Sequence, residues 1–225
     1  NGSAYSGEVT HGLRDGWMPL PSVEWSPAPD LRLRTEAFAV EQQGAPVTLV
    51  RYRVSNTSSH AVRGTLSLLL RPLQINPPWQ HGGTSPIRTV AIEGPSSATR
   101  VRVNGRVLFH SLTPVGARGA AGFGTHGEYE ITRDVARGAV PSNLRAEDAD
   151  GLAAAALLYP VRLRAGETRD VVIAFPLGTA RIDTEAATLP AAPEPDRAAL
   201  LGGRGESAAF DALADATADA WQARL

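Results

Sequence analysis

Residues 31–40 have the sequence LRLRTEAFAV, in which apolar or small side chains alternate with larger ones. The odd positions hold Leu, Thr or Ala, and the even positions between them hold Arg32, Arg34, Glu36 and Phe38. A period of two is the pattern of a β-strand, because successive side chains point to opposite faces of a sheet. We therefore predict a strand here, with one face that is largely charged.

The next two segments continue this pattern. Residues 47–55, VTLVRYRVS, alternate again, and NTSS at 56–59 separates them from a third apolar run at 62–70. β-Branched and aromatic residues favour strands, whereas Asn and Ser favour turns. Three consecutive strands with short connections predict an antiparallel meander.

Two further strand pairs are indicated by their turns. Asn104-Gly105 lies between segments 100–103 and 106–112 and supplies the two positive-φ residues of a type I′ hairpin turn. Ala165-Gly166-Glu167 separates strands predicted at 152–164 and 168–177. Many short strands without long helices between them predict a mainly β, antiparallel sandwich rather than a fold of βαβ units.

Three segments depart from the β pattern. Residues 116–127 contain five glycines, and a short helix is expected at 128–137, ended by Gly138. Residues 178–206 are rich in Ala, Pro and Gly and predict an extended linker. Residues 207–225 predict an amphipathic helix, because its apolar residues recur at spacings of three and four: Phe210, Leu213, Ala214, Ala218, Trp221 and Leu225.

The two ends of the chain lead us to expect one domain of a larger protein. The sequence starts with Asn1 rather than Met, and the last helix has no Gly, Asn or Pro near its end to stop it. The expected organisation is a β-domain at 1–177, a linker at 178–206 and a helix at 207–225. This helix packs on its own domain or leads toward a downstream domain.

Composition narrows the functional classes. The chain has 225 residues, 43% of them hydrophobic, and a net charge of −1 without a basic cluster, which argues against nucleic-acid binding. It has no Cys, and no apolar run approaches the roughly 20 residues of a membrane-spanning helix. All 22 basic residues are Arg, which is typical of GC-rich bacterial genomes. We expect a soluble bacterial protein of the cytoplasm or periplasm.

The order of these elements resembles a known architecture. The chain is similar to the β-supersandwich that precedes an (α/α)6 toroid. The segments that carry this resemblance are an opening at Trp25 to Phe38, then RYRVSN at 51–56, and a closing LRAGET at 163–168 with VVIAFP at 171–176. This galactose-mutarotase-like domain occurs in several glycoside hydrolases and phosphorylases. The resemblance implies that catalytic carboxylates lie downstream of Leu225, in a toroid that would be the partner of this domain.

The candidate ligand-binding residues lie in one loop. The segment RPLQINPPWQHGG, residues 71–83, combines a flat aromatic ring, amides, a guanidinium and an imidazole, which are groups that stack on sugar rings and bind hydroxyls. The candidates are Arg71, Gln74, Asn76, Trp79 and His81. A structural alternative is that Pro77-Pro78 forms a rigid crossover and Trp79 covers the edge of the sandwich.

The remaining motifs give weaker evidence of a functional site. Residues 122–127 match GxGxxG, but that motif needs a parallel βαβ unit, so we interpret it as a glycine-rich loop. The acidic groups Glu128/Glu130 and Glu147/Asp148/Asp150 are interpreted as solvated loop charges. A mutarotase would use a His with a carboxylate, for which His81 or His126 with Glu128 are the candidates. We assign no catalytic residue, metal site or cofactor.

The sequence-based hypothesis is a non-catalytic accessory domain of a carbohydrate-active protein that shapes or supports a glycan cleft. The alternatives are a sugar-binding, lectin-like module, an aldose-epimerase-like enzyme and an adhesive domain without a ligand. Neither nucleic acid nor membrane is an expected partner.

Overall fold

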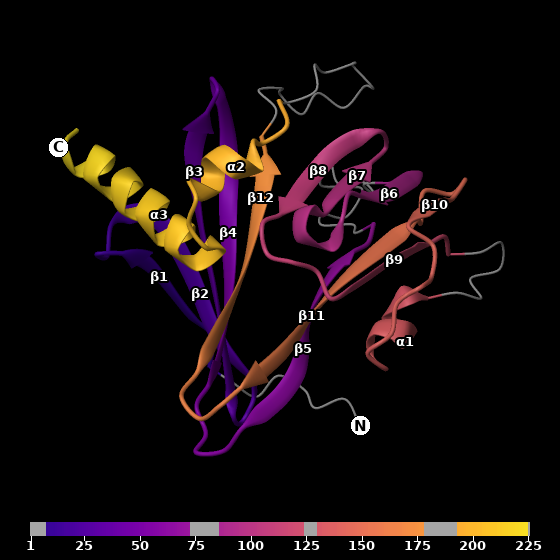
Figure 1. Ribbon diagram of the computed structural model, residues 1–225, viewed down its shortest axis with the longest axis horizontal. Coiled ribbons are helices and arrows are strands. Elements are labelled where there is room, and N and C mark those ends of the chain that lie inside the picture. The colour runs from indigo at the N-terminus through magenta and orange to yellow at the C-terminus, as the bar shows by residue number, and fades with distance from the viewer. Residues whose placement is uncertain (1–7, 73–85, 124–129, 178–192, 225) are drawn as a thin grey trace, which may run out of the picture. The chain divides into compact units, whose positions relative to one another are not determined.

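The computed structural model describes residues 8–72, 86–123, 130–177 and 193–224, and it is mainly antiparallel β (Figure 1). This confirms the predicted fold class. The chain divides into two compact units, each built from separate segments. The first unit comprises residues 1–64, 111–113 and 161–225, and the second comprises 65–110 and 114–160.

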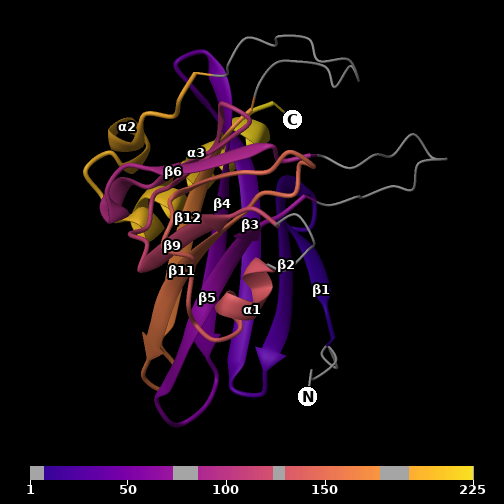
Figure 2. The same cartoon turned by 90° about the vertical axis from the view of Figure 1, so that its right-hand side faces the viewer.

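The first unit contains a sheet of five consecutive strands covered by helices. The strand order is β1 (Thr10–Arg14), β2 (Met18–Ala28), β3 (Leu31–Gln42), β4 (Ala45–Asn56) and β12 (Thr168–Pro176), and every neighbouring pair is antiparallel. Helix α2 (Arg197–Leu201) and helix α3 (Glu206–Gln222) follow at the C-terminal end. Helix α3 runs across one face of this sheet in Figure 1, and Figure 2 shows the same helix after a 90° turn.

The predicted C-terminal helix is confirmed, and its apolar stripe forms part of the core. Phe210 is 2% exposed and meets Phe38 of β3 edge to face, with ring centroids 4.9 Å apart. The remaining buried members of this cluster come from three strands, α2, α3 and the segment at residues 111–113: Met18, Leu20, Val47, Leu49, Leu112, Val172, Ala174, Leu200, Leu201, Ala209, Ala214 and Ala218. The face of β3 that carries Phe38 also carries Glu36, so α3 covers the face expected to be charged.

Turns with positive φ angles connect the strands of two hairpins. Asn104 and Gly105 have φ of 48° and 80° and join β7 (Arg100–Val103) to β8 (Arg106–Ser111), which confirms the predicted I′ hairpin. The same pattern recurs at Gln43-Gly44 between β3 and β4, with φ of 51° and 76°. Glycine occupies the second position of both turns, where φ is 80° and 76°, because most side chains are strained there.

The second unit contains two groups of strands. One has the order β8, β7, β6 (Thr89–Glu93) and β10 (Arg145–Glu147), and the other has the order β5 (Val62–Leu70), β11 (Ala154–Leu163) and β9 (Ala117–Ala121). Strands β5 and β11 extend a few residues into the first unit. A 3-10 turn at Ser96–Ala98 precedes β7, and helix α1 (Ile131–Val135) follows the segment at 124–129. Gly138, with φ of 73°, lies just after α1, as predicted.

The expected meander of three strands is wrong. The strands at 31–40, 47–55 and 62–70 are not one meander, because β5 pairs with β11 whereas β4 pairs with β3 and β12. Strand β12 forms nine consecutive pairs with β4, from Thr168 opposite Ser55 to Pro176 opposite Val47, and so occupies the edge that β5 would need.

The glycine-rich stretch also contains a strand that was not predicted. Residues 117–121, ARGAA, form β9, which pairs with β11 from Ala117 to Ala121. A side chain at Gly119 would collide with the backbone of Pro141, so this strand needs small residues where the chain is tightly packed. Small residues have weak strand propensity, which hides such a strand from the sequence pattern.

The predicted linker is described only at its end. Residues 178–192 lie outside the described residues, and α2 forms within 193–206. Asp196 caps α2, because its carboxylate accepts hydrogen bonds from the backbone N–H groups of Ala198 and Ala199 at 2.9 and 3.2 Å. Gly202, in the left-handed conformation, ends the helix.

The packing of α3 predicts that its two aromatic residues contribute differently to the free energy of unfolding. Phe210→Ala removes a fully buried ring and is expected to lower the free energy of unfolding by about 3–5 kcal/mol. Trp221→Ala on the same helix is the matched control, because Trp221 is 40% exposed and its loss is expected to cost less than about 1 kcal/mol. Urea denaturation of the three proteins measures both values, and equal losses would contradict the described packing of α3.

Candidate functional site

The structure describes one of the five predicted ligand-binding residues. Arg71 follows β5 in the second unit and is exposed. Gln74, Asn76, Trp79 and His81 lie outside the described residues, so their predicted role stays a prediction.

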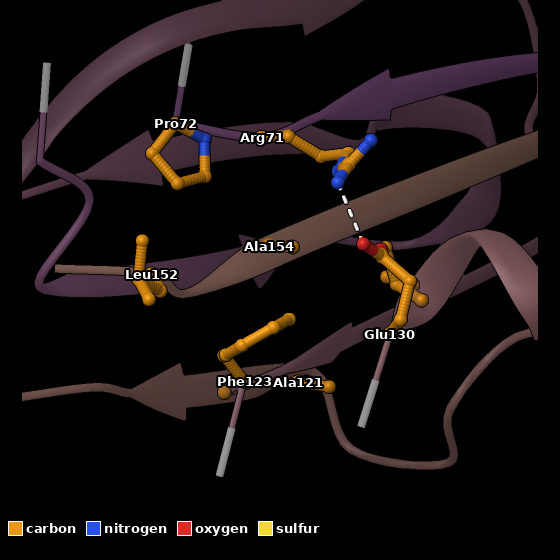
Figure 3. A pocket seen from close by; sticks show the side chains of 9 residues that line it. Arg71, Pro72, Ala121, Phe123, Glu130, Leu152 and Ala154 are labelled. Atoms are coloured by element: carbon orange, nitrogen blue, oxygen red, sulfur yellow. Dashed lines mark hydrogen bonds and ion pairs between the residues drawn. The ribbon is translucent and has the colours of Figure 1, made fainter. Parts of the chain in front are cut away.

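Arg71 lines a cavity of about 220 Å³ within the second unit (Figure 3). Four segments of the unit form its walls: the residues after β5, the end of β9 with the residues after it, the start of α1, and the start of β11 with the residues before it. The lining residues are Arg71, Pro72, Ala121, Gly122, Phe123, Glu130, Ile131, Leu152 and Ala154. The cavity thus brings together residues that are as much as 83 positions apart in the chain (71 to 154).

The polar side of the cavity is an ion pair. Arg71 Nη2 donates a hydrogen bond to Glu130 Oε2 at 2.6 Å, and the two side chains are 41% and 25% exposed. Glu130 Oε1 accepts a hydrogen bond from Thr132 N at 3.3 Å, so the same carboxylate caps α1. This cap holds the carboxylate in place while it faces Arg71, and solvent reaches both charged groups.

The opposite side of the cavity is apolar. Figure 3 shows Pro72 and Leu152 across the cavity from the Arg71–Glu130 pair, with the Phe123 side chain below them. Leu152 is 36% exposed although it is a large apolar residue, whereas Ile131 and Ala154 are buried. Accessible apolar groups beside an accessible ion pair form a surface that can contact both the apolar and the hydroxyl-bearing parts of a ligand.

Asp148 positions the apolar wall. Its Oδ2 accepts a hydrogen bond from Phe123 N at 2.8 Å, and its Oδ1 accepts from Leu152 N at 3.0 Å and Asp150 N at 3.1 Å. These bonds, first among them the one from Phe123, hold the pKa of Asp148 below its ordinary value. Asp148 therefore orders the two segments that carry Phe123 and Leu152.

The other residues considered for chemistry do not come together in the described chain. Glu147 and Asp150 are exposed, and Glu128, His81 and His126 lie outside the described residues, as does most of the GxGxxG segment. Within residues 8–72, 86–123, 130–177 and 193–224, no three His, Cys, Asp or Glu side chains are grouped so that they could hold a metal ion. Among the described residues that line the cavity, Glu130 is the one carboxylate.

A second charged cluster lies in the first unit, under α3. Arg51 is 5% exposed, and its Nε and Nη2 donate to Glu36 Oε2 at 2.9 and 2.7 Å. Its Nη1 donates to Asp211 Oδ1 of α3 at 2.6 Å, and its guanidinium carbon lies 4.2 Å from the centroid of the Phe210 ring. This arrangement combines charge-assisted hydrogen bonds with a cation–π contact.

This cluster has the features of a structural element. The cavity of about 340 Å³ beside it is lined by charged side chains that are already in ion pairs, including Arg14 with Asp215 at 2.7 Å and Arg34 with Glu36 at 3.3 Å. Arg51, at the centre of this cluster, is buried, and its guanidinium is bonded to both Glu36 and Asp211, so it joins α3 to the sheet. We therefore interpret the Arg51 cluster as the attachment of α3 to the sheet and the Arg71 cavity as the candidate site.

The comparisons with known proteins assign no family to this chain, so its function has to be inferred from the site. No protein-family model matches this chain, and no curated protein matches it significantly. Among the helices in the described part of the chain, none is long and apolar enough to cross a membrane.

Among the residues that line the cavity, the sequence pattern identifies only Arg71 as a candidate. The expectation of solvated loop charges is wrong for Glu130 and Asp148, because Glu130 bonds Arg71 and caps α1, and Asp148 accepts three backbone hydrogen bonds. No local pattern indicates Phe123, Leu152 or Ala154 as site residues. One available signal was Asp148 followed by Asp150 and Gly151, which is the composition of a turn in which an Asp side chain binds nearby backbone N–H groups. That signal predicts an ordered turn, although it does not identify Phe123 as a partner.

Asp170, which lies 3.6 Å from Arg51 in the first unit, makes stability depend on pH. Asp170 is 4% exposed, and its burial acts to raise its pKa, but the two hydrogen bonds from Arg53 at 2.8 and 2.7 Å and the charges of Arg53 and Arg51 lower it overall. A lowered folded-state pKa gives stability that is complete above the unfolded value of about 3.9 and is lost as the pH falls through the folded value.

Asp170→Asn is therefore expected to lower the free energy of unfolding by about 3 kcal/mol at neutral pH. The difference from wild type is expected to shrink as the pH falls below about 4. Asp215→Asn is the control, because Asp215 is 63% exposed and its pair with Arg14 contributes less than about 1 kcal/mol. Urea denaturation at pH 7, 5 and 3 measures these values, and a pH-independent difference for Asp170→Asn would contradict the assignment.

The role of Asp148 is tested by a second pair of variants. Asp148→Ala removes the acceptor of three backbone hydrogen bonds and is expected to destabilise the protein by about 1–2 kcal/mol. Asp150→Ala, in the same turn, is expected to change stability by less than about 0.5 kcal/mol. Hydrogen exchange of the Phe123 and Leu152 amides distinguishes the two, because it is expected to accelerate only in Asp148→Ala.

Proposed function

We propose that this chain is a carbohydrate-binding accessory domain that holds a glycan in the Arg71 cavity. The observation that carries the proposal is the accessible Arg71–Glu130 pair at 2.6 Å, facing an apolar wall that includes Phe123 and Leu152. The proposal includes the finer fold assignment, a galactose-mutarotase-like supersandwich, and a catalytic toroid as the partner domain, both of which come from the resemblance in strand order.

The chemistry of a sugar matches the two sides of this cavity. A pyranose has hydroxyl groups at its rim and an apolar face of C–H groups. Arg71 offers several N–H donors and Glu130 offers acceptors, so together they can bind neighbouring hydroxyls. An aromatic ring such as Phe123 can pack against the C–H face. An ion pair that is 41% and 25% exposed can exchange water for hydroxyl groups without a large rearrangement.

The arrangement favours binding over turnover. Glycoside hydrolysis uses two carboxyl groups on opposite sides of the scissile bond. In the described lining of the cavity the carboxylate of Glu130 is already bound to Arg71 and to the N-terminus of α1. A carboxylate held in this way is suited to accept a hydrogen bond from a ligand rather than to transfer a proton.

The proposal is tested by measuring binding and its dependence on Arg71. The intact chain is applied to an array of neutral and acidic glycans, and the affinity for each bound glycan is measured by calorimetry. Arg71→Ala is expected to lower that affinity at least about tenfold, because a hydrogen bond to a charged group contributes about 1.5–3 kcal/mol. Arg133→Ala removes an exposed arginine of α1 that does not line the cavity and serves as the control.

Two results would overturn the proposal. One is that no glycan binds to the wild-type chain, and the other is that Arg71→Ala binds as tightly as Arg133→Ala does. Interconversion of sugar anomers by the isolated chain would replace the accessory role with an epimerase activity. Retention of that activity in Arg71→Ala would place the reaction outside the Arg71 cavity.

A further inference from the structure

A second cavity of about 490 Å³ lies next to the Arg71 cavity in the second unit. Its lining is mostly polar, and it includes Asp134, Ser142, Asn143, Arg145 and Glu147. We call this second cavity the polar cavity. Ser142, Asn143, Arg145 and Glu147 are exposed, so the polar cavity is open to solvent.

The two cavities share part of their walls. Ala121 and Gly122, at the end of β9, line both of them. Helix α1 also contributes to both, because Glu130 at its N-cap lines the Arg71 cavity and Asp134 lines the polar cavity. The shared residues make the two cavities neighbours, and we call the pair of cavities the groove.

The junction between the cavities depends on a glycine. A Cβ atom at Gly122 would lie 3.0 Å from the Glu147 carbonyl oxygen and 3.2 Å from Asp148 Oδ2. These contacts are tighter than ordinary van der Waals distances, so a side chain here would displace the groove wall. The Ala120 N–H donates to the Asn143 carbonyl at 2.7 Å and holds the loop of the polar cavity against β9.

We propose that the two cavities are neighbouring subsites for one neutral oligosaccharide of at least two sugar residues. This inference rests on the proposed function and specifies its ligand class. Pockets for small ligands have volumes of roughly 300–1,000 Å³, so the Arg71 cavity alone, at about 220 Å³, holds little more than one ring. The polar cavity provides the space and the hydrogen-bonding groups for the next one.

The charges of the groove favour a neutral ligand. Arg71 and Arg145 provide two positive charges, and Glu130, Asp134 and Glu147 provide three negative charges. The groove therefore has no positive excess for a uronic acid or a sulfated sugar. Asn143 and Ser142 add uncharged groups that donate to and accept from hydroxyls.

The test compares oligosaccharides of different length and charge. The probes are glucose, xylose, mannose, galactose and N-acetylglucosamine series of one to four residues, with oligogalacturonides of the same lengths. For the series that binds, affinity is expected to rise at least about tenfold from one residue to two and to be weaker for the acidic probes. Calorimetry on the intact chain measures each value.

Variants locate the second subsite. Ser142→Trp places a large ring in the polar cavity and is expected to remove the gain from the second residue while leaving monosaccharide affinity unchanged. Asn143→Ala is expected to reduce the same gain without filling the cavity. Ser97→Trp, at another exposed serine of the second unit, is the control.

The outcomes separate this inference from the proposed function. If the longer probes bind no tighter than the monosaccharide, or Ser142→Trp and Ser97→Trp behave alike, the second subsite is overturned. The proposed function then still stands if Arg71→Ala weakens binding. Equal affinity for oligogalacturonides would overturn the neutral specificity, and absence of binding to every probe would overturn both proposals.

Discussion

The guanidinium of Arg51 is buried under α3, and the first unit depends on the compensation of its charge. Glu36 lies directly opposite Arg51 on the neighbouring strand, and Asp211 reaches it from α3. Removing a partner from a buried charge costs several kcal/mol, so strand pairing and helix packing are coupled through this one group. The Phe210 ring over the guanidinium adds apolar burial at the same place. Helix α3 is thereby a component of the domain core.

The Arg71–Glu130 pair resembles the Arg51–Glu36 pair in its geometry, but it has a different role. Both pairs have a donor and an acceptor less than 3 Å apart, but Arg51 is almost completely buried whereas Arg71 is 41% exposed. In the interior, a charged pair fixes one arrangement of the chain. At the rim of a cavity, the same pair can bind a ligand because water already reaches it. Exposure, more than chemical identity, makes the Arg71 cavity the candidate site and the Arg51 cluster a structural one.

The candidate site was predicted only at Arg71. The loop composition drew attention to this residue, since guanidinium and aromatic groups in one loop indicate ligand binding. Glu130 carried no such signal, because a carboxylate in a polar stretch is usually solvated. Phe123 lies in a glycine-rich segment and Leu152 at the start of a predicted strand, so neither has a local pattern that places it in a cavity. Their meeting depends on Asp148, whose carboxylate joins segments 25 residues apart.

The sequence alone determined the mainly β class, most of the strands, the Asn104-Gly105 hairpin and the C-terminal amphipathic helix, because alternation, turn chemistry and helical spacing act within a few residues. The tertiary structure decided which strands pair: β4 with β12 instead of β5, and the unexpected β9 with β11. It also decided that a charged strand face is covered by α3 and that Arg71 meets Glu130. These outcomes depend on packing and charge compensation between distant segments, which no local pattern encodes.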